Sequence, residues 1–222
     1  MIGVAIPAHD EEERLSACVA SVLRAACHPA LAGERVEVVV VLDACRDRSF
    51  EAAARHPVEI LSIEARNVGR ARALGADALL ESRARWLTFT DADTIVSRDW
   101  LAAQLALDAD AVCGTVGVAG WWLHPLELRE RYRARYMDAD GHRHVHGANL
   151  GVAAEWYRRV GGFASLPAHE DVALVDALER AGARIAWSAA PRVVTSARRD
   201  ARARGGFGDH LLALAAGHGV NA

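Results

Sequence analysis

The sequence predicts an α/β fold built on a single, mostly parallel central sheet flanked by helices. Short apolar runs alternate with helical patterns along the first half of the chain, which is typical of βαβ units. Acidic residues directly follow several of these runs, as expected where ligands collect at the carboxyl edge of such a sheet. The 222 residues, 52% of them hydrophobic, suffice for the core of one sizeable domain.

Five strands are expected in the first half, because apolar residues form short runs bounded by turn signals. They span 2–7, 36–42, 58–63, 86–90 and 111–118. A helix is expected over 11–26, where Leu15, Cys18, Val19 and Val22 recur at helical spacing. A second is expected over 68–80, with Asn67 as its N-cap. Both helices are expected to cover the sheet.

The character of the chain changes after Gly120. Paired tryptophans, a charged helical pattern over 126–136 and a histidine-rich segment follow. A helix over 171–180 ending near Gly182 precedes short strands at 184–187 and 192–195. An arginine- and glycine-rich tail over 197–208 leads to a short amphipathic pattern at 211–216. Since no linker interrupts the chain, one domain over 1–222 is expected.

The composition excludes several classes of protein. The net charge of −3 gives no reason to expect nucleic acid as a partner. All 26 basic side chains are arginine, and without lysine neither Walker-type hydrolases, protein kinases nor Schiff-base enzymes can operate. The four cysteines lack metal-ligand spacing, which fits reduced thiols in the cytoplasm. No apolar run approaches the roughly 20 residues of a transmembrane helix, so only peripheral membrane contact stays open.

Two aspartates, Asp91 and Asp93, stand one residue apart where the run 86–90 ends. Mg²⁺ is typically held by one or two carboxylates together with substrate phosphates, and this edge of a sheet is where such ligands bind. A polar turn is the alternative, because Asp commonly ends strands. The pair therefore indicates phosphate chemistry if other segments supply a nucleotide site.

The first two strands end in residues that fit such a site. The first runs into Pro7, Ala8, His9 and Glu11 without a glycine-rich turn, which disfavours a dinucleotide-binding fold. The second ends at Asp43, whose carboxylate is suited to accept a hydrogen bond from a base N–H. Helix capping is the alternative for Asp43, and it is the favoured account of the neighbouring Asp47.

These segments resemble the glycosyltransferases of family 2, whose Rossmann-like GT-A fold binds a nucleotide-diphosphate sugar. Residues 4–12 are similar to the family's Pro-x-Tyr-Asn-Glu segment, with His9 and Asp10 replacing Tyr and Asn. Residues 42–47 resemble its Asp-Asp-Gly-Ser-x-Asp segment without the glycine and serine, and residues 67–75 resemble its Asn-x-Gly and Ala-Arg-Asn-x-Gly elements. The triplet 91–93 matches its Asp-x-Asp.

The resemblance implies that residues 1–120 form a nucleotide-sugar-binding half, with a UDP- or GDP-sugar as donor. It assigns Mn²⁺ or Mg²⁺ to Asp91 and Asp93, uracil contact to Asp43 and nucleotide binding to Arg72, for which Arg66 and Arg70 compete. The residues expected to contact the nucleotide sugar are Pro7, Ala8, His9, Glu11, Asp43, Arg72, Asp91, Ala92, Asp93 and Asn149.

Residues 121–222 are expected to bind the acceptor, whose identity the resemblance leaves open. The segment containing Glu170 and Asp171 resembles the family's Glu-Asp-x-Asp-Leu, which implies Asp171 as general base of an inverting transfer to an acceptor hydroxyl. Glu170 would orient the acceptor or the base. A helix cap is the alternative for the pair. Segments like the family's Gly-x-Asn and Gly-Gly-Phe contain Asn149 and Gly161–Gly162, and Asn149 is expected to contact donor or acceptor.

Three further groups of residues each have two interpretations. Trp121 and Trp122 either stack on an acceptor ring or pack internally. The histidines at 142, 144 and 146 would share one face of a strand and approach a metal, although a solvated loop is favoured for the first two. The tail arginines either bind the diphosphate or an anionic acceptor, or are solvated; they are Arg198, Arg199, Arg202 and Arg204.

Three other functions are weighed against glycosyl transfer. A haloacid dehalogenase-like phosphatase would use Asp91 and Asp93, but its motif normally opens the first strand, whereas three expected strands precede this one. A sugar-nucleotide pyrophosphorylase would need a glycine-rich loop after the first strand, and residues 7–12 contain no glycine. A catalytically silent nucleotide-sugar-binding module stays open, although it would not need Glu170 and Asp171.

Overall fold

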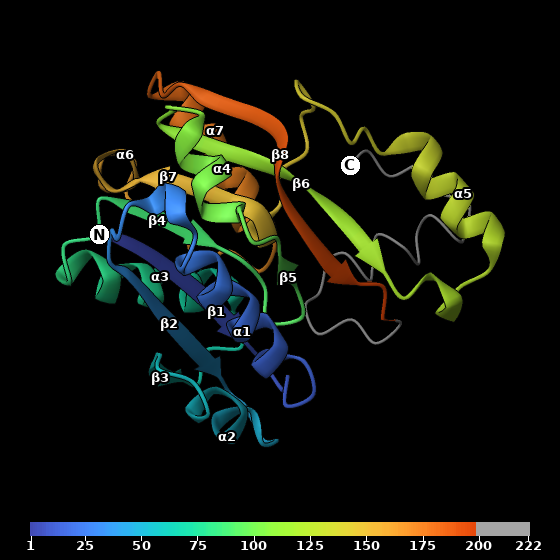
Figure 1. Ribbon diagram of the computed structural model, residues 1–222, viewed down its shortest axis with the longest axis horizontal. Helices are drawn as coiled ribbons and strands as arrows, with labels where there is room; N and C mark the ends of the chain where they lie inside the picture. The colour runs from blue at the N-terminus through green and yellow to red at the C-terminus, as the bar shows by residue number, and fades with distance from the viewer. Residues whose placement is uncertain (199–222) are drawn as a thin grey trace.

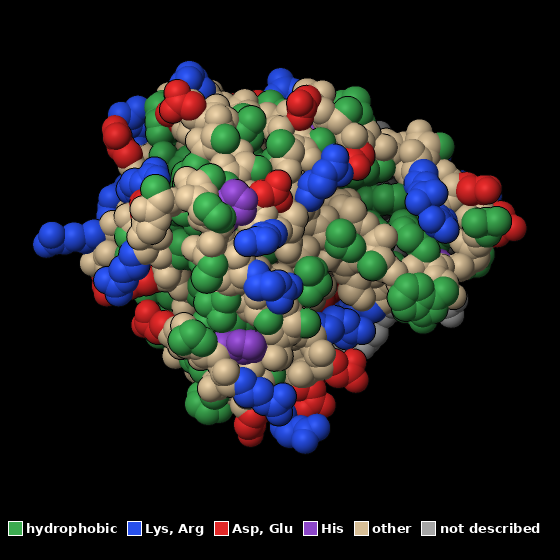
Figure 2. Space-filling view, in the orientation of Figure 1, with side chains coloured by type: hydrophobic (Ala, Val, Ile, Leu, Met, Phe, Trp, Pro, Cys, Tyr) green, Lys and Arg blue, Asp and Glu red, His purple; other side chains and the backbone are tan. Residues whose placement is uncertain are grey.

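The computed structural model describes residues 1–198 (Figure 1). The short helix expected at 211–216 lies outside the described residues, as do Arg199, Arg202 and Arg204. On the face shown in Figure 2, acidic and basic side chains are interspersed among hydrophobic ones, so neither sign of charge dominates that face.

One sheet of eight strands crosses the described part of the chain in the order β3-β2-β1-β4-β7-β6-β8-β5. β1 pairs in parallel with β2 and β4, β2 with β3, and β6 with β8, whereas β7 is antiparallel to β4 and β6, and β5 to β8. The sheet is therefore mostly parallel, as predicted. The strands are β1 (Ile2–Ala8), β2 (Val36–Asp43), β3 (Glu59–Ile63), β4 (Trp86–Phe89), β5 (Ile95–Val96), β6 (Ala111–Ala119), β7 (Leu150–Ala153) and β8 (Ile185–Ser196).

Helices cover both faces of the sheet, and side-chain alternation along the strands divides the core into two layers. Val4 of β1 packs in the layer that contains α1 and α4, whereas its neighbour Ala5 packs in the layer that contains α3 and α7. Both faces of β1 are buried, which is why its sequence is a continuous apolar run. The helices are α1 (Leu15–Ala26), α2 (Ser49–Ala54), α3 (Val68–Glu81), α4 (Trp100–Ala106), α5 (Leu126–Arg135), α6 (Ala154–Arg159) and α7 (Glu170–Arg180). Short 3₁₀ helices are η1 (Pro29–Leu31), η2 (Trp121–Leu123) and η3 (Gly147–Asn149).

Helix α1 begins four residues later than the sequence predicts. Asp10 has a left-handed φ of 52°, which turns the chain sharply after β1. The backbone N–H of Glu11 then donates to Ser49 Oγ at 2.7 Å and that of Glu12 to Asp47 at 2.8 Å. These bonds tie residues 10–12 to the start of α2, so the segment forms a turn at the sheet edge instead of a first helical turn. In contrast, α3 begins as predicted, with Asn67 Oδ1 accepting the N–H of Arg70 at 2.9 Å.

The two short strands expected at 184–187 and 192–195 form one strand, β8. Its register with β6 shifts between Gly114 and Val116, and Pro191, which has no N–H to donate, lies in the part of β8 that this irregularity leaves unpaired. Strands β5 and β7 were not predicted. They are two and four residues long, too short for a pattern of hydrophobic residues to identify them.

The histidine-rich segment does not form a solvated loop. His142 is fully buried, and the rings of His142 and His144 stack at 5.5 Å. The ring of Tyr136 stacks on His144 at 4.2 Å and on Tyr132 of α5 at 5.1 Å. Aromatic stacking is favourable when a ring can leave water, so the segment folds against α5. Within residues 1–198 these histidines form no cluster with metal-ligand geometry.

The two tryptophans have different environments. Trp121 packs against Tyr132, with ring centroids 5.3 Å apart, which favours the packing interpretation for this residue. Trp122, in η2, is exposed. No helix among the described residues is both long and apolar enough to cross a membrane.

Candidate active site

The topology brings the predicted acidic residues together at one edge of the sheet. Glu11 follows β1, Asp43 ends β2, and Asp91 and Asp93 follow β4, which are three neighbouring parallel strands. Helix α7 adds Glu170 in its first turn. Because parallel strands share the direction in which they end, Glu11 and Asp93 reach the same edge although they are 82 positions apart in sequence (93 − 11).

One carboxylate oxygen of Asp93 accepts hydrogen bonds from two hydroxyl groups. Its Oδ1 accepts hydrogen bonds from Thr195 Oγ1 at 3.1 Å and from Thr94 Oγ1 at 3.4 Å. Thr195 belongs to β8, whose pairing with β5 places it next to the Asp-x-Asp turn. Burial of the carboxyl, and secondly the nearby charge of Asp91, raise the pKa of Asp93.

Asp91 is the more accessible member of the pair, with 37% of its side chain exposed. Its Oδ1 accepts a hydrogen bond from Nη2 of Arg72. Its backbone carbonyl accepts the N–H of Thr94, which closes the turn after β4. Asp91 thus presents an oxygen to solvent while the buried guanidinium fixes the orientation of its carboxylate.

Arg72 lies between two carboxylates. Its guanidinium is 4% exposed and forms ion pairs with Asp91 and with Glu170 of α7. Burial raises the pKa of Glu170, and the charge of Arg72 opposes that effect. The sequence suggested that Arg72 binds the nucleotide; in this structure its observed partners are Asp91 and Glu170.

Gly147 makes room for this guanidinium. A Cβ atom at position 147 would lie 2.4 Å from Cζ of Arg72, so no larger residue fits without displacing the arginine. The N–H of Gly147 also donates to Oδ2 of Asp171 at 2.7 Å. Asp171 lies in the first turn of α7, where the helix dipole favours a carboxylate. One glycine therefore contacts both the arginine next to Asp91 and the predicted base.

Asp43 is buried and organises the loop before α3. Its Oδ1 accepts the N–H groups of Ala65 and Arg66, and its Oδ2 accepts that of Asn67, each at 2.7 Å. The carbonyl of Asp43 contacts Nδ1 of His9 at 2.6 Å, which fixes the ring next to β2. Pro7 and Ala8 are buried in β1, whereas the His9 ring is partly exposed and open to a ligand.

Asn149 is fully buried and its amide is already bonded. Nδ2 donates to the carbonyls of Thr115 and Pro191, both at 2.8 Å, and Oδ1 accepts the indole N–H of Trp100 at 2.9 Å. These bonds satisfy the carbonyls that the irregular β6–β8 pairing leaves free. The side chain expected to contact donor or acceptor instead joins β6, β8 and α4.

The donor set at Asp91 and Asp93 fits a divalent metal such as Mn²⁺ or Mg²⁺. Both residues offer hard oxygen ligands, and a cation between them would relieve the repulsion that raises the pKa of Asp93. Glu11 adds a third carboxylate at this edge; its side chain is buried, and its Oε2 has no hydrogen-bond partner within residues 1–198. Buried polar atoms normally have a partner, so a cation is a suitable occupant of this edge.

A second acidic group lies near Asp10. Ligand atoms of Asp10, Cys45 and Asp47 lie within 4.8 Å of one another. Both carboxylates already accept backbone N–H groups. The carboxylate of Asp10 accepts those of Arg46 and Asp47. The carboxylate of Asp47 accepts those of Glu12 and Ser49. The group therefore shapes the turn after β1. Asp47 accepts the N–H of Ser49, the first residue of α2, but the N-cap position itself is Arg48.

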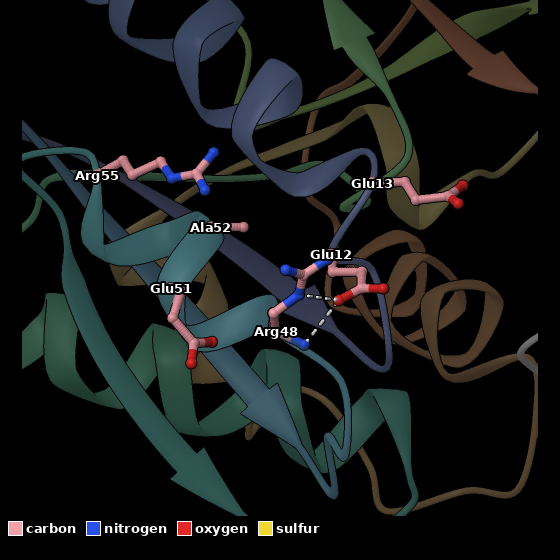
Figure 3. A pocket seen from close by; sticks show the side chains of 6 residues that line it. All are labelled: Glu12, Glu13, Arg48, Glu51, Ala52 and Arg55. Atoms are coloured by element: carbon pink, nitrogen blue, oxygen red, sulfur yellow. Dashed lines mark hydrogen bonds and ion pairs between the residues drawn. The ribbon is translucent and has the colours of Figure 1, made fainter.

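A hollow of ≈ 300 Å³ lies between that turn and α2 (Figure 3). Arg48 and Glu12 are joined across it by an ion pair, with Nε and Oε2 3.1 Å apart. It contains none of the predicted catalytic or metal-binding carboxylates. Its lining residues are Glu12, Glu13, Arg48, Glu51, Ala52 and Arg55.

Two contacts in this site could not be predicted from the sequence. Thr195 binds Asp93 from 102 positions away, and the N–H of Gly147 binds Asp171. The first depends on the pairing of a two-residue strand, and the second involves a backbone atom that every residue except proline has. The resemblance singled out the segment containing Gly147, but no pattern could assign that partner.

The solved structures most relevant here share the fold at low sequence identity. The chain is similar to S. aureus TarS 1–349 in complex with UDP-GlcNAc (14% identity, TM-score 0.68, covering 96% of this chain and 64% of that one). It is similar to the mannosyltransferase PcManGT from Pyrobaculum calidifontis in complex with GDP-Man and Mn²⁺, at 21% identity and a TM-score of 0.66, covering 90% of this chain and 58% of that one. It is also similar to GalNAc-T7 with UDP, GalNAc and Mn²⁺, at 16% identity and a TM-score of 0.65, covering 89% of this chain and 44% of that one. The chain thus spans less than two thirds of each of these proteins.

A search among curated proteins returned no match. The family model described as "Glycosyl transferase family 2" matches residues 3–159, which is more than half of the chain. The matched region includes the Asp-x-Asp pair and Arg72 but ends before α7. The fold, the arrangement of carboxylates at the sheet edge and this match agree: the chain belongs to glycosyl transferase family 2.

Proposed function

We propose that this protein transfers a sugar from a nucleotide-diphosphate donor to an acceptor hydroxyl, with a divalent metal at Asp91 and Asp93. The observation that carries the proposal is the link from Asp91 through Arg72 to Glu170, the residue next to Asp171. It connects the carboxylate pair after β4 to a carboxylate at the start of α7. A donor half and an acceptor half therefore meet at one place in the sheet.

The donor site is formed by the ends of β1, β2 and β4. The partly exposed His9 ring would stack on the base, and Asp43 positions both that ring and the loop before α3. Similar structures bind UDP-GlcNAc or GDP-Man, which supports a UDP- or GDP-sugar as the donor class. Asn149 is left out of the proposed contacts because its amide is buried and bonded.

Asp91 and Asp93 would hold Mn²⁺ or Mg²⁺. A divalent ion bound there would neutralise the charge of the departing nucleoside diphosphate. Arg72 orients the Asp91 carboxylate and holds a further positive charge at this edge of the sheet. We propose that Arg72 positions the carboxylates of Asp91 and Glu170, because its guanidinium is buried between them.

Asp171 would act as general base in an inverting transfer. Its Oδ2 accepts the Gly147 N–H, which orients the carboxylate, and a carboxylate so placed can accept the proton of an acceptor hydroxyl. Glu170 would position this part of α7 through its ion pair with Arg72.

Three cysteines within the described residues lie in buried or partly buried positions, and all four are free thiols, which supports the proposed cytoplasmic location.

The experiment measures binding of UDP- and GDP-sugars by thermal shift, with and without Mn²⁺, for wild type, Asp93→Asn and the control Asp99→Asn. Asp99 is exposed and lies outside the site. At a ligand concentration of 100 Kd the stabilisation is about 2.7 kcal/mol, which corresponds to roughly 5–10 °C in Tm. We expect one class of donor to give this shift with Mn²⁺ in wild type and Asp99→Asn, and Asp93→Asn to lose the metal dependence.

Equal donor binding with and without Mn²⁺ in wild type would refute the metal assignment. A second measurement, release of nucleoside diphosphate from the bound donor, separates an enzyme from a silent binding module. A module would bind the donor and release nothing. A haloacid dehalogenase-like phosphatase would hydrolyse a generic phosphate ester, and the family assignment disfavours it.

A further inference from the structure

Arg198 contacts two of the acidic residues at the sheet edge. One guanidinium nitrogen, Nη1, lies 2.5 Å from Oε1 of Glu11, and Nη2 lies 3.4 Å from Oδ2 of Asp93. Arg198 follows the end of β8 by two residues, so β8 carries it to the ends of β1 and β4. The side chains of all three residues are largely buried, with exposures of 17% for Arg198, 5% for Glu11 and 12% for Asp93.

The two carboxylates need a positive partner because both are removed from water. Burying a carboxylate is costly unless a charged group pairs with it, and Arg198 lies within ion-pair distance of both. Among residues 1–198 no other cation forms an ion pair with either carboxylate, and Arg14 pairs with Glu13. Arg198 is therefore the main counter-charge for this pair of carboxylates.

The oxygens of Asp93 are divided between two kinds of partner. Oδ1 accepts the hydroxyl groups of Thr94 and Thr195, whereas Oδ2 faces the guanidinium of Arg198. A cation that binds Asp93 through Oδ2 must approach on the side that Arg198 occupies. Two positive charges at one carboxylate oxygen repel each other, and burial strengthens that repulsion.

We propose that Arg198 is an internal counter-ion that competes with the divalent metal for Asp93. The inference rests on the metal site of the proposed function and adds a residue that opposes metal binding. The distances indicate how the exchange would occur, since the contact with Asp93 is longer by 0.9 Å than the contact with Glu11. Arg198 can release Asp93 while Glu11 retains it, so the arginine stays at the site when the metal arrives.

The test measures the Kd of Mn²⁺ alone, without nucleotide, by electron paramagnetic resonance of the free ion. Wild type is compared with Arg198→Gln and Arg198→Met, two neutral variants whose folding is checked by circular dichroism. Both are expected to bind Mn²⁺ about fivefold more tightly, a factor typical of removing one partly buried ion pair. Arg198→Lys keeps the charge and should stay within about twofold of wild type.

Arg192→Gln is the matched control, because Arg192 lies on β8, the strand that Arg198 follows, but pairs with Asp138 and is 62% exposed. Its Kd should equal that of wild type. Unchanged or weaker Mn²⁺ binding in a folded neutral variant, with binding abolished in Asp93→Asn, would overturn the inference and leave the metal site intact. If Asp93→Asn binds Mn²⁺ as wild type does, the proposed metal site itself fails.

Discussion

At the scale of single residues, the main feature is the number of charges that share a small buried volume. Arg72 lies between Asp91 and Glu170, and Gly147 lies against it. Removing one partner of a buried pair leaves an uncompensated charge, which destabilises a protein by about 3–5 kcal/mol. These residues therefore depend on one another, and a mutation at one changes the geometry of the others.

Asp171 allows the base to be tested separately from donor binding. Asp171→Asn keeps the side-chain shape and an oxygen that can accept the Gly147 N–H, but it removes the basic carboxylate. We expect unchanged Kd for the nucleotide sugar and a loss of transfer of about 10²–10⁴-fold, measured as kcat with the acceptor present. Near-normal turnover would assign the base to another residue, for which Glu170 and His169 are the nearest candidates in sequence.

Sequence reasoning located the carboxylates correctly but could not predict burial. Asp43, Asp91 and Asp93 lie at the predicted edge because strand ends can be recognised from apolar runs. The burial of Asn149 and His142 depends on which distant strands and rings pack over them. That packing is a tertiary property that a local pattern does not contain, and the same holds for the partners of Arg72.

At the scale of elements, turns and loops at strand ends are fixed by individual side chains. Asp43 accepts three N–H groups of the loop after β3, and Asp47 accepts the N–H and the hydroxyl of Ser49 at the start of α2. Long apolar strands and amphipathic helices were predictable because their periodicity is repeated several times. β5 was not predictable from periodicity, since it has only two residues and they are placed by pairing with β8.

Glu34 provides a test of such a connection between elements. It precedes β2 and pairs with Arg85, which precedes β4. The hydrogen bonds from Arg85 lower the pKa of Glu34 to about 2. Because the folded-state pKa is lowered, the pair stabilises the protein above the unfolded-state pKa of about 4.3, and this stabilisation is lost as the pH falls toward 2.

Glu34→Gln should therefore lower the free energy of unfolding by about 1 kcal/mol at pH 7, a value reduced by screening because Arg85 is half exposed. The difference from wild type should shrink as the pH falls from 5 to 3, measured by urea unfolding at each pH. Glu155→Gln is the control, because Glu155 is 79% exposed in its pair with Arg159 and should change little at any pH. A difference that stays constant with pH would contradict the assigned role of Glu34.

At the scale of the whole molecule, the sheet joins the two predicted halves. β4 from residues 1–120 pairs with β7 from residues 121–222 over four residues. One core layer also contains residues from both halves, for example Val39 and Leu79 together with Leu150 and Leu174. The sequence prediction of a single domain stays a prediction, and this continuity supports it.

Heating should therefore unfold the protein in a single cooperative transition. Calorimetry is expected to give equal calorimetric and van't Hoff enthalpies, the criterion for a two-state transition. Two resolved transitions would show that the halves unfold separately, despite the ladder between β4 and β7. Adding Mn²⁺ with a bound donor should raise the single Tm without dividing the transition.

The contacts of Asp93 with Thr195 and Arg198 also determine when the site is completed during synthesis. The ribosome releases the Asp-x-Asp turn about 100 residues before the residues that bind it. A nascent chain that ends after α7 would contain Asp91, Asp93 and the Thr94 hydroxyl, but neither Thr195 nor Arg198. The surroundings of Asp93 are thus complete only after β8, the last strand within residues 1–198, has been made.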